Sequence, residues 1–100
     1  MSVVITTSGT VATISLSGDF DFSRQEKLQQ AFEQTLTGQP AQIDIDLTDT
    51  TFIDSSVIRL LLRLRDQALV NQTSLTIVNC SDRIREIFMI GGFDQIFNIS

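Results

Sequence analysis

Apolar and polar residues alternate in the first part of the chain, and this alternation predicts two β-strands. Residues 3–16 hold two β-rich runs, separated by Thr7-Ser8-Gly9-Thr10, a composition typical of a hairpin turn. In the second run the apolar residues stand at every other position and alternate with smaller or polar ones. The buried face predicted for this strand consists of Ala12, Ile14 and Leu16.

The same alternation recurs at residues 41–47 and again at 74–79. In the first of these strands the apolar residues Ile43, Ile45 and Leu47 share one face, whereas Asp44 and Asp46 share the other. Because two carboxylates on one face are costly to bury, we expect this face to meet water or a partner. Helices should therefore cover mainly one face of the sheet.

Apolar residues spaced three or four apart predict three helices. The first follows Ser23-x-x-Glu26, a capping-box pattern that makes Ser23 the expected N-cap, and it stops at Gly38 and Pro40. The second should begin with Asp54 or Ser55 as its cap and run to about residue 70, with Asn71 as a left-handed residue at its end.

The third helix should begin at Ser81 or Asp82 and stop at Gly91-Gly92, and the last residues read as a turn and a short strand. The order is two strands, then three helices alternating with two strands. We therefore predict one α/β domain over residues 1–100, with right-handed crossovers and a mixed sheet of four to five strands.

Composition narrows the functional classes. The 100 residues carry a formal net charge of −5, so a phosphate backbone would be repelled and no direct nucleic-acid partner is expected. The single cysteine, Cys80, cannot form an internal disulfide and suits a reducing compartment. No stretch approaches the ~18 apolar residues of a membrane span, so we expect a cytoplasmic protein without direct membrane insertion.

The chain contains no histidine, which excludes Ser-His-Asp and Cys-His catalysis and any metal site that uses imidazole. Aspartates are frequent in the first half, but their spacing fits no known calcium-binding loop. No phosphate-binding glycine motif occurs either. We therefore expect neither an enzyme nor a bound cofactor or metal.

Two adjacent serines open the second predicted helix, and they could be helix caps, nucleophiles or sites of modification. A helical projection places Ser56 in the polar stripe with Arg59 and Arg63, whereas Ser55 lies at its edge, better placed to cap backbone amides. Val57 faces inward. A phosphate at a helix N-terminus is electrostatically tolerated, because free amides and the helix dipole favour anions.

Three segments together resemble the STAS domain family, named for sulfate transporters and anti-sigma factor antagonists. "DLTDTTFIDSSV" (46–57) is similar to the family's segment around the Asp-Ser-Ser motif, and "LSGDFD" (16–21) to the turn before its first helix. "LTIVNCSDRIREIFMIGGFDQIF" (75–97) is similar to the final strand, helix and ending. The resemblance implies the STAS fold, with helices mainly on one face of the sheet.

The resemblance also implies a function, that of a stand-alone anti-sigma factor antagonist. In such proteins an anti-sigma factor with serine kinase activity phosphorylates the second serine, here Ser56, and binds only the unphosphorylated form. A PP2C-type phosphatase reverses the modification. The alternative is a STAS subunit that docks on a membrane transporter or a larger assembly without being phosphorylated.

The surface expected to bind the partner lies around the serines and the turn before the first helix. One departure from the family pattern is Val57, which stands where glycine usually follows the second serine and would crowd a partner's backbone. The predicted partner-binding residues are Asp19, Asp21, Asp54, Ser55, Ser56, Val57, Arg59, Leu60 and Arg63.

Overall fold

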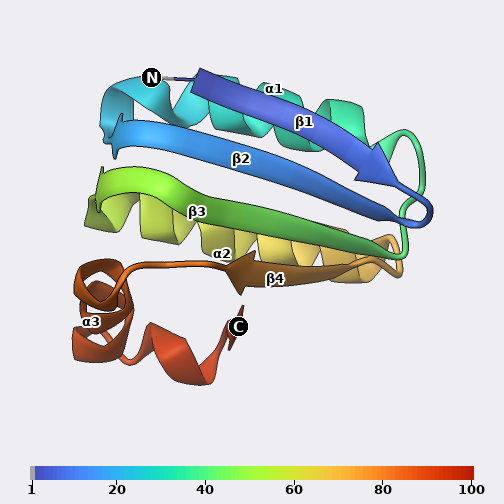
Figure 1. The fold of residues 1–100 in the computed structure, drawn as a ribbon. Coiled ribbons are helices and arrows are strands. Elements are labelled where there is room, and N and C mark those ends of the chain that lie inside the picture. The colour runs from blue at the N-terminus through green and yellow to red at the C-terminus, as the bar shows by residue number, and fades with distance from the viewer. Residues whose placement is uncertain (1) are drawn as a thin grey trace.

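A computed structural model describes residues 2–100 and shows a five-stranded mixed sheet with the strand order β1-β2-β3-β4-β5 (Figure 1). β1 and β2 form an antiparallel hairpin, and all later strands pair in parallel. The strands are β1 (Ser2–Ser8), β2 (Val11–Phe20), β3 (Gln42–Ile53), β4 (Ser74–Val78) and β5 (Asn98–Ile99).

Helices cover one face of this sheet and leave the other open, as predicted (Figure 1). α1 (Gln25–Leu36) lies behind β1 and β2, α2 (Ser55–Val70) lies behind β3 and β4, and α3 (Asp82–Ile90) follows β4 at one end. Two short 3-10 helices, η1 (Phe22–Arg24) and η2 (Phe93–Gln95), complete the chain. The predicted α/β fold class and sheet are confirmed.

The alternation in β3 sorts its side chains as expected. Ile43, Ile45 and Leu47 are each fully buried under the helices, whereas Asp44 and Asp46 lie half-buried on the open face. The Asp46 carboxylate accepts hydrogen bonds from the Thr48 amide (2.9 Å) and hydroxyl (2.6 Å). Burial raises the pKa of Asp46, but these hydrogen bonds outweigh it and hold the pKa below its ordinary value.

β3 is longer than the alternation at 41–47 indicated. Its pairing with β4 ends at Asp46↔Val78, but β3 continues to Ile53 beside β2 alone. The β2–β3 register shifts twice along this extension, which breaks the simple alternation by which a strand is recognised. Thr50 is buried there, and its hydroxyl donates to the Leu16 carbonyl oxygen at 2.8 Å.

The predicted start of the first helix was wrong. Ser23 lies inside η1, and Asp21 caps that short helix by accepting a hydrogen bond from the Ser23 amide at 2.9 Å. α1 begins at Gln25 after Arg24, which makes no side-chain cap. Since Asp is as good a capping residue as Ser, the 3-10 turn between the cap and α1 accounts for the displacement.

The other helix ends follow the sequence more closely. Asp54 caps α2, and Ser81 caps α3 by accepting a hydrogen bond from the Ile84 amide at 3.2 Å. The predicted left-handed Asn71 was wrong, since its φ is −94° and the next residue, Gln72, has φ 60° instead. The left-handed turn thus lies one residue later than the helical pattern suggested.

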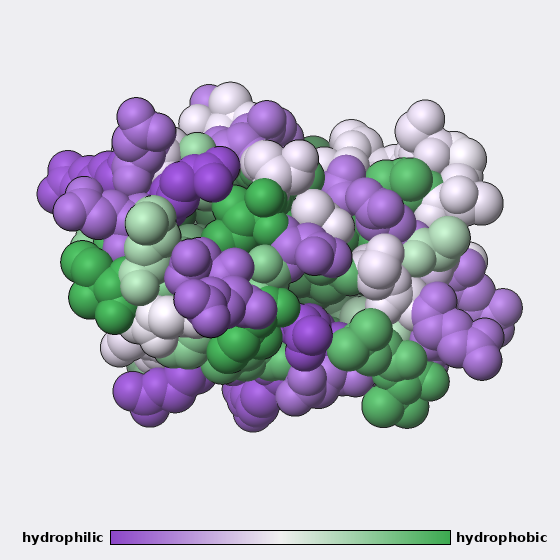
Figure 2. All heavy atoms as spheres, turned by 90° about the horizontal axis from the view of Figure 1, so that it is seen from below, coloured by the Kyte–Doolittle hydropathy of each residue, from purple (hydrophilic) through white to green (hydrophobic). Residues whose placement is uncertain are grey.

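Several apolar residues remain exposed on the surface. Figure 2 shows one side of the molecule, on which apolar groups are separated by polar ones rather than merged into one patch. None of the helices in the described part of the chain is long and apolar enough to span a membrane. The exposed apolar residues include Leu69, Val70, Met89, Ile90 and Ile96.

The central strand should dominate stability. Ile45→Ala removes a fully buried side chain, so we expect the free energy of unfolding, measured by urea denaturation, to fall by about 2–5 kcal/mol. Ile90→Ala is the matched control, because Ile90 is 81% exposed and should change stability by less than about 0.5 kcal/mol. Equal losses in both variants would contradict this description of the core.

Candidate functional site

Asp54 stands at the junction between the end of β3 and the start of α2. Its backbone is extended (φ −98°, ψ 172°), and its amide donates to the Phe20 carbonyl oxygen at 3.2 Å, which continues the β2–β3 pairing. The Oδ1 atom accepts hydrogen bonds from the Val57 amide at 3.0 Å and from the Ser56 hydroxyl at 2.5 Å. Asp54 thereby caps α2 and fixes the Ser56 side chain with one oxygen.

The second carboxylate oxygen of Asp54 reaches a different segment. Oδ2 accepts a hydrogen bond from the Phe22 amide at 3.2 Å, across 32 positions of sequence. One side chain therefore holds the start of α2, the Ser56 hydroxyl and the first residue of η1 together. Hydrogen bonds to a carboxylate are among the stronger ones in proteins, so this side chain fixes the local arrangement of both segments.

The structure distinguishes the two serines more sharply than the helical projection did. Ser56 is half-buried and bonded to Asp54, whereas Ser55 is exposed and takes part in no side-chain hydrogen bond found in the described residues. Of the two predicted caps of α2, Asp54 is confirmed and Ser55 is not, because the Asp54 carboxylate accepts the hydrogen bond from the Val57 amide. Ser56 keeps the predicted place on the side of α2 that bears Arg59 and Arg63.

Asp19 and Asp21 lie at the end of β2, on the segment that Asp54 joins to α2. Asp19 accepts a hydrogen bond from the Thr51 hydroxyl, across the β2–β3 extension. Asp21 accepts from the hydroxyl and the amide of Ser23, at 2.5 and 2.9 Å. These hydrogen bonds, the one from the hydroxyl above all, hold the pKa of Asp21 below its ordinary value.

A shallow groove of about 490 Å³ opens beside Ser56, between the start of α1 and the outer side of α2. Arg59 and Arg63 are exposed along it and make no ion pair within the described part of the chain. The residues that line the groove are Phe22, Gln25, Ser56, Arg59, Leu60, Leu62 and Arg63. The site therefore combines an aromatic side chain, two free cations and a hydroxyl.

Val57 and Leu60 occupy different positions from the other predicted contact residues. Val57 is fully buried, so its side chain packs in the core and leaves the surface next to Ser56 uncrowded. Leu60 is 1% exposed and forms the floor of the groove. The exposed part of the groove is therefore formed by the residues around them, such as Arg59 and Arg63.

Phe22 and Phe52 were missed as surface residues. Phe22 is 75% exposed and Phe52 is 42% exposed, although aromatic side chains usually lie inside a domain of this size. The sequence offered one signal for Phe22, because it directly follows the turn "GDFD" and precedes a helix start. Exposed aromatic residues beside arginines are typical of the centres of protein interfaces.

The described residues form no cluster of metal-binding side chains near this site. Across residues 2–100, no three histidine, cysteine or acidic side chains converge closely enough to hold an ion. The Ser56 hydroxyl contacts a carboxylate that is itself occupied by two backbone amides. The Ser56 hydroxyl is therefore held in place by Asp54 at the start of α2.

Comparison with known sequences identifies the family. The family profile described as "Mlab, STAS domain" matches residues 3–98. A STAS-domain containing protein of Pseudomonas aeruginosa is 36% identical over 92 residues, which cover 92% of this chain and 90% of that protein. The chain belongs to the STAS domain family.

Solved structures show the same STAS fold. An anti-sigma factor antagonist from Mycobacterium paratuberculosis superposes with a TM-score of 0.86 at 22% identity, over 98% of this chain and 83% of that one. The anti-sigma factor antagonist SpoIIAA in its unphosphorylated form superposes with a TM-score of 0.82 at 17% identity, over 99% of this chain and 88% of that one. The phosphorylated form of SpoIIAA, a Bacillus cell fate determinant, superposes with a TM-score of 0.74 at 18% identity, over 99% of this chain and 91% of that one.

Removing the Asp54 carboxylate should destabilise the protein. We expect Asp54→Ala to lower the free energy of unfolding by about 1–2 kcal/mol, because the α2 cap is lost. Ser55→Ala, one residue along and without a side-chain hydrogen bond, should stay within about 0.5 kcal/mol of the wild type. Urea denaturation measures both variants, and a larger loss for Ser55→Ala would reverse the assignment of the cap.

The pKa of Asp21 should depend on Ser23. We expect a side-chain carbon NMR titration to place the Asp21 midpoint below 3.8, and Ser23→Ala to move it upward. Because the folded pKa is depressed, the stabilisation is complete above 3.8 and is lost as the pH falls through the folded pKa. An unchanged midpoint in Ser23→Ala would show that the hydroxyl bond does not set this pKa.

Proposed function

We propose that this protein is an anti-sigma factor antagonist that is switched off by phosphorylation of Ser56. It is a non-enzymatic regulator, and a substrate of its partner rather than a catalyst. In its unphosphorylated form it binds an anti-sigma factor with serine kinase activity in the cytoplasm. The observation that carries the proposal is the hydrogen bond from the Ser56 hydroxyl to Asp54 at the start of α2.

Phosphorylation would convert this hydrogen bond into a repulsion. The kinase would transfer the γ-phosphoryl group of ATP to the Ser56 oxygen, with release of ADP and of the hydroxyl proton, so this oxygen could no longer donate to Asp54. Two like unit charges about 4 Å apart near a protein surface repel by about 4 kcal/mol. The helix dipole stabilises a negative charge at the helix N-terminus by only about 0.3–1 kcal/mol. The repulsion is the stronger of these two effects, so the phosphate and the Asp54 carboxylate must separate.

Separation would alter the surface that a partner meets. Asp54 also binds the Phe22 amide, so a displaced carboxylate disturbs the exposed phenyl ring next to the groove. The new phosphate would lie beside Arg59 and Arg63, and would compete for these cations with acidic groups of a partner. Both effects weaken binding while leaving the core intact.

The proposed partner surface is a cluster of exposed groups around the groove. Phe22 supplies an aromatic anchor, and the two arginines supply charge-assisted donors. Asp19, Asp21 and Ser55 form its border. A PP2C-type phosphatase would restore the unphosphorylated state.

A second candidate is a STAS subunit that docks on a membrane transporter and is never phosphorylated. The residue after Ser56 favours it, because Val57 departs from the glycine that usually follows the second serine in the family pattern. Affinity capture from native cells separates the two candidates. Recovery of a serine kinase supports the switch, and recovery of a transporter ATPase supports the alternative.

Two substitutions at neighbouring serines should test the switch. We expect Ser56→Asp to weaken binding of the kinase partner at least tenfold, about 1.4 kcal/mol, in isothermal titration calorimetry. Ser55→Asp is the matched control, because it adds the same charge at the same helix end without facing Asp54. Equal affinities for both variants would overturn electrostatic switching at Ser56.

The modified residue can be identified directly. Incubation with the partner kinase and ATP, followed by mass spectrometry of peptides, should find phosphate on Ser56 of the wild type and of Ser55→Ala. Ser56→Ala should bind the partner but remain unmodified. Phosphate on Ser55 alone would rule out the assignment.

A further inference from the structure

β1 is an edge strand with an open side. Among the described residues it pairs only with β2, and it stands at the end of the strand order. The outward backbone amides and carbonyls of an edge strand lack partners within the sheet and can pair with another chain. The opposite edge offers much less, because β5 has only two residues.

Natural edge strands usually carry features that prevent such pairing, and β1 carries none of them. Its sequence, "SVVITTS", contains no charged residue, proline or glycine. Residues 3–7 are all β-branched, which favours the extended conformation. The seven consecutive pairs with β2 show no bulge that would bend the edge away.

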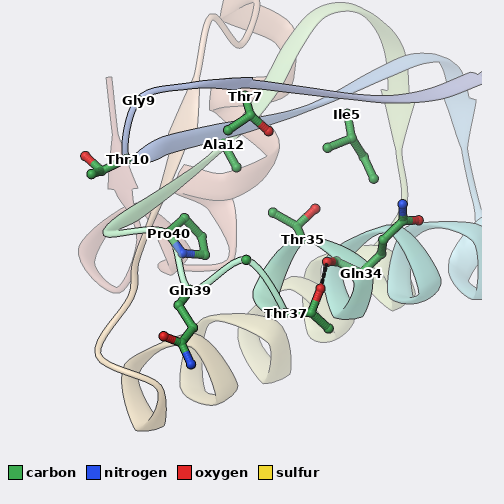
Figure 3. Close-up of a pocket in the computed structure, with 11 residues that line it drawn as sticks. Ile5, Thr7, Gly9, Thr10, Ala12, Gln34, Thr35, Thr37, Gln39 and Pro40 are labelled. Carbon is green, nitrogen blue, oxygen red and sulfur yellow. Dashed lines mark hydrogen bonds between the residues drawn. The ribbon is translucent and has the colours of Figure 1, made fainter.

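The sheet is also incompletely covered behind this edge. A cavity of about 370 Å³ lies between β1 and the last turn of α1, with Ile5 on the strand and Thr35 on the helix extending into it (Figure 3). Val3 and Ile5 pack against the core but remain half-buried. Another strand beside β1 would cover both side chains.

We propose that β1 pairs with β1 of a second copy, antiparallel, in a dimer with a continuous ten-stranded sheet. The register that uses the whole strand puts Ile5 on the twofold axis, with Val4 opposite Thr6 and Val3 opposite Thr7 of the second copy. Directly opposite residues must share a face, and this register meets that condition at every position. The occupant is a second copy because this register sets uncharged β-branched residues opposite one another throughout positions 3–7.

Electrostatics and position agree with this pairing. The chain has a net charge of −5, yet the paired strands are uncharged, so no like charges meet at their contact. α1 lies against β1, whereas α2, which supplies most of the residues that line the groove beside Ser56, lies against β4, so the α2 side of this groove lies away from the paired edge. One strand pair buries less than the ~1,600 Å² of a standard interface, which makes the dimer weak and concentration-dependent.

Charge substitutions on the open face test the register. Val4 is 49% exposed and Thr6 is exposed, so the double variants Val4→Lys/Thr6→Lys and Val4→Lys/Thr6→Glu should both fold. In the proposed register residue 4 faces residue 6 of the second copy. The double-lysine variant therefore places lysine opposite lysine, whereas the lysine–glutamate variant places lysine opposite glutamate. We expect at least tenfold weaker dimerisation for the first and wild-type or tighter dimerisation for the second.

Sedimentation velocity from about 10 µM to about 1 mM measures the dimerisation constants, with circular dichroism to establish folding. Net charge alone predicts the reverse order, because the double-lysine variant reduces the magnitude of the net negative charge, from −5 to −3, and so reduces general repulsion between copies. A wild-type protein that stays monomeric throughout would overturn the proposal. So would equal dimerisation of the two double variants.

Discussion

The carboxylate of Asp54 is the constraint on which the functional end of this molecule depends. Its two oxygens accept hydrogen bonds from the Val57 and Phe22 amides and from the Ser56 hydroxyl. These hydrogen bonds connect the start of α2 to the segment after β2. A single substitution here would release three groups at once. The same side chain that stabilises the helix start also orients the hydroxyl that is proposed to be modified, so the proposed regulation would act on an interaction that also stabilises the fold.

The fold explains how one carboxylate can reach both segments. β2 and β3 extend together beyond β4, and the pairing continues through the Asp54 amide to the Phe20 carbonyl oxygen. Phe20 and Ile53 are buried at the end of this extension, which fixes the two segments side by side. Because α2 lies on the outside of the sheet, Ser55 at its start and Arg59 and Arg63 on its outer side are exposed to solvent.

Much of this could be predicted from the sequence, since the regular alternation of Ile43, Ile45 and Leu47 and the helical spacing of α2 reflect burial on one face. The extension of β3 could not, because its register shifts interrupt the alternation. The 3-10 turn displaced the expected cap at Ser23, and local patterns do not distinguish Asp21 from Ser23 as a cap. The bond from Phe22 to Asp54 spans 32 positions and depends on tertiary structure alone.

The central claim is that a phosphate on Ser56 acts through repulsion from Asp54. The most direct measurement is a double-mutant cycle on the free energy of unfolding, with wild type and Asp54→Asn each prepared with and without phosphate on Ser56 by chemical synthesis. The account predicts that phosphorylation destabilises the wild type by at least about 1 kcal/mol more than it destabilises Asp54→Asn. Equal effects in the two backgrounds would contradict it.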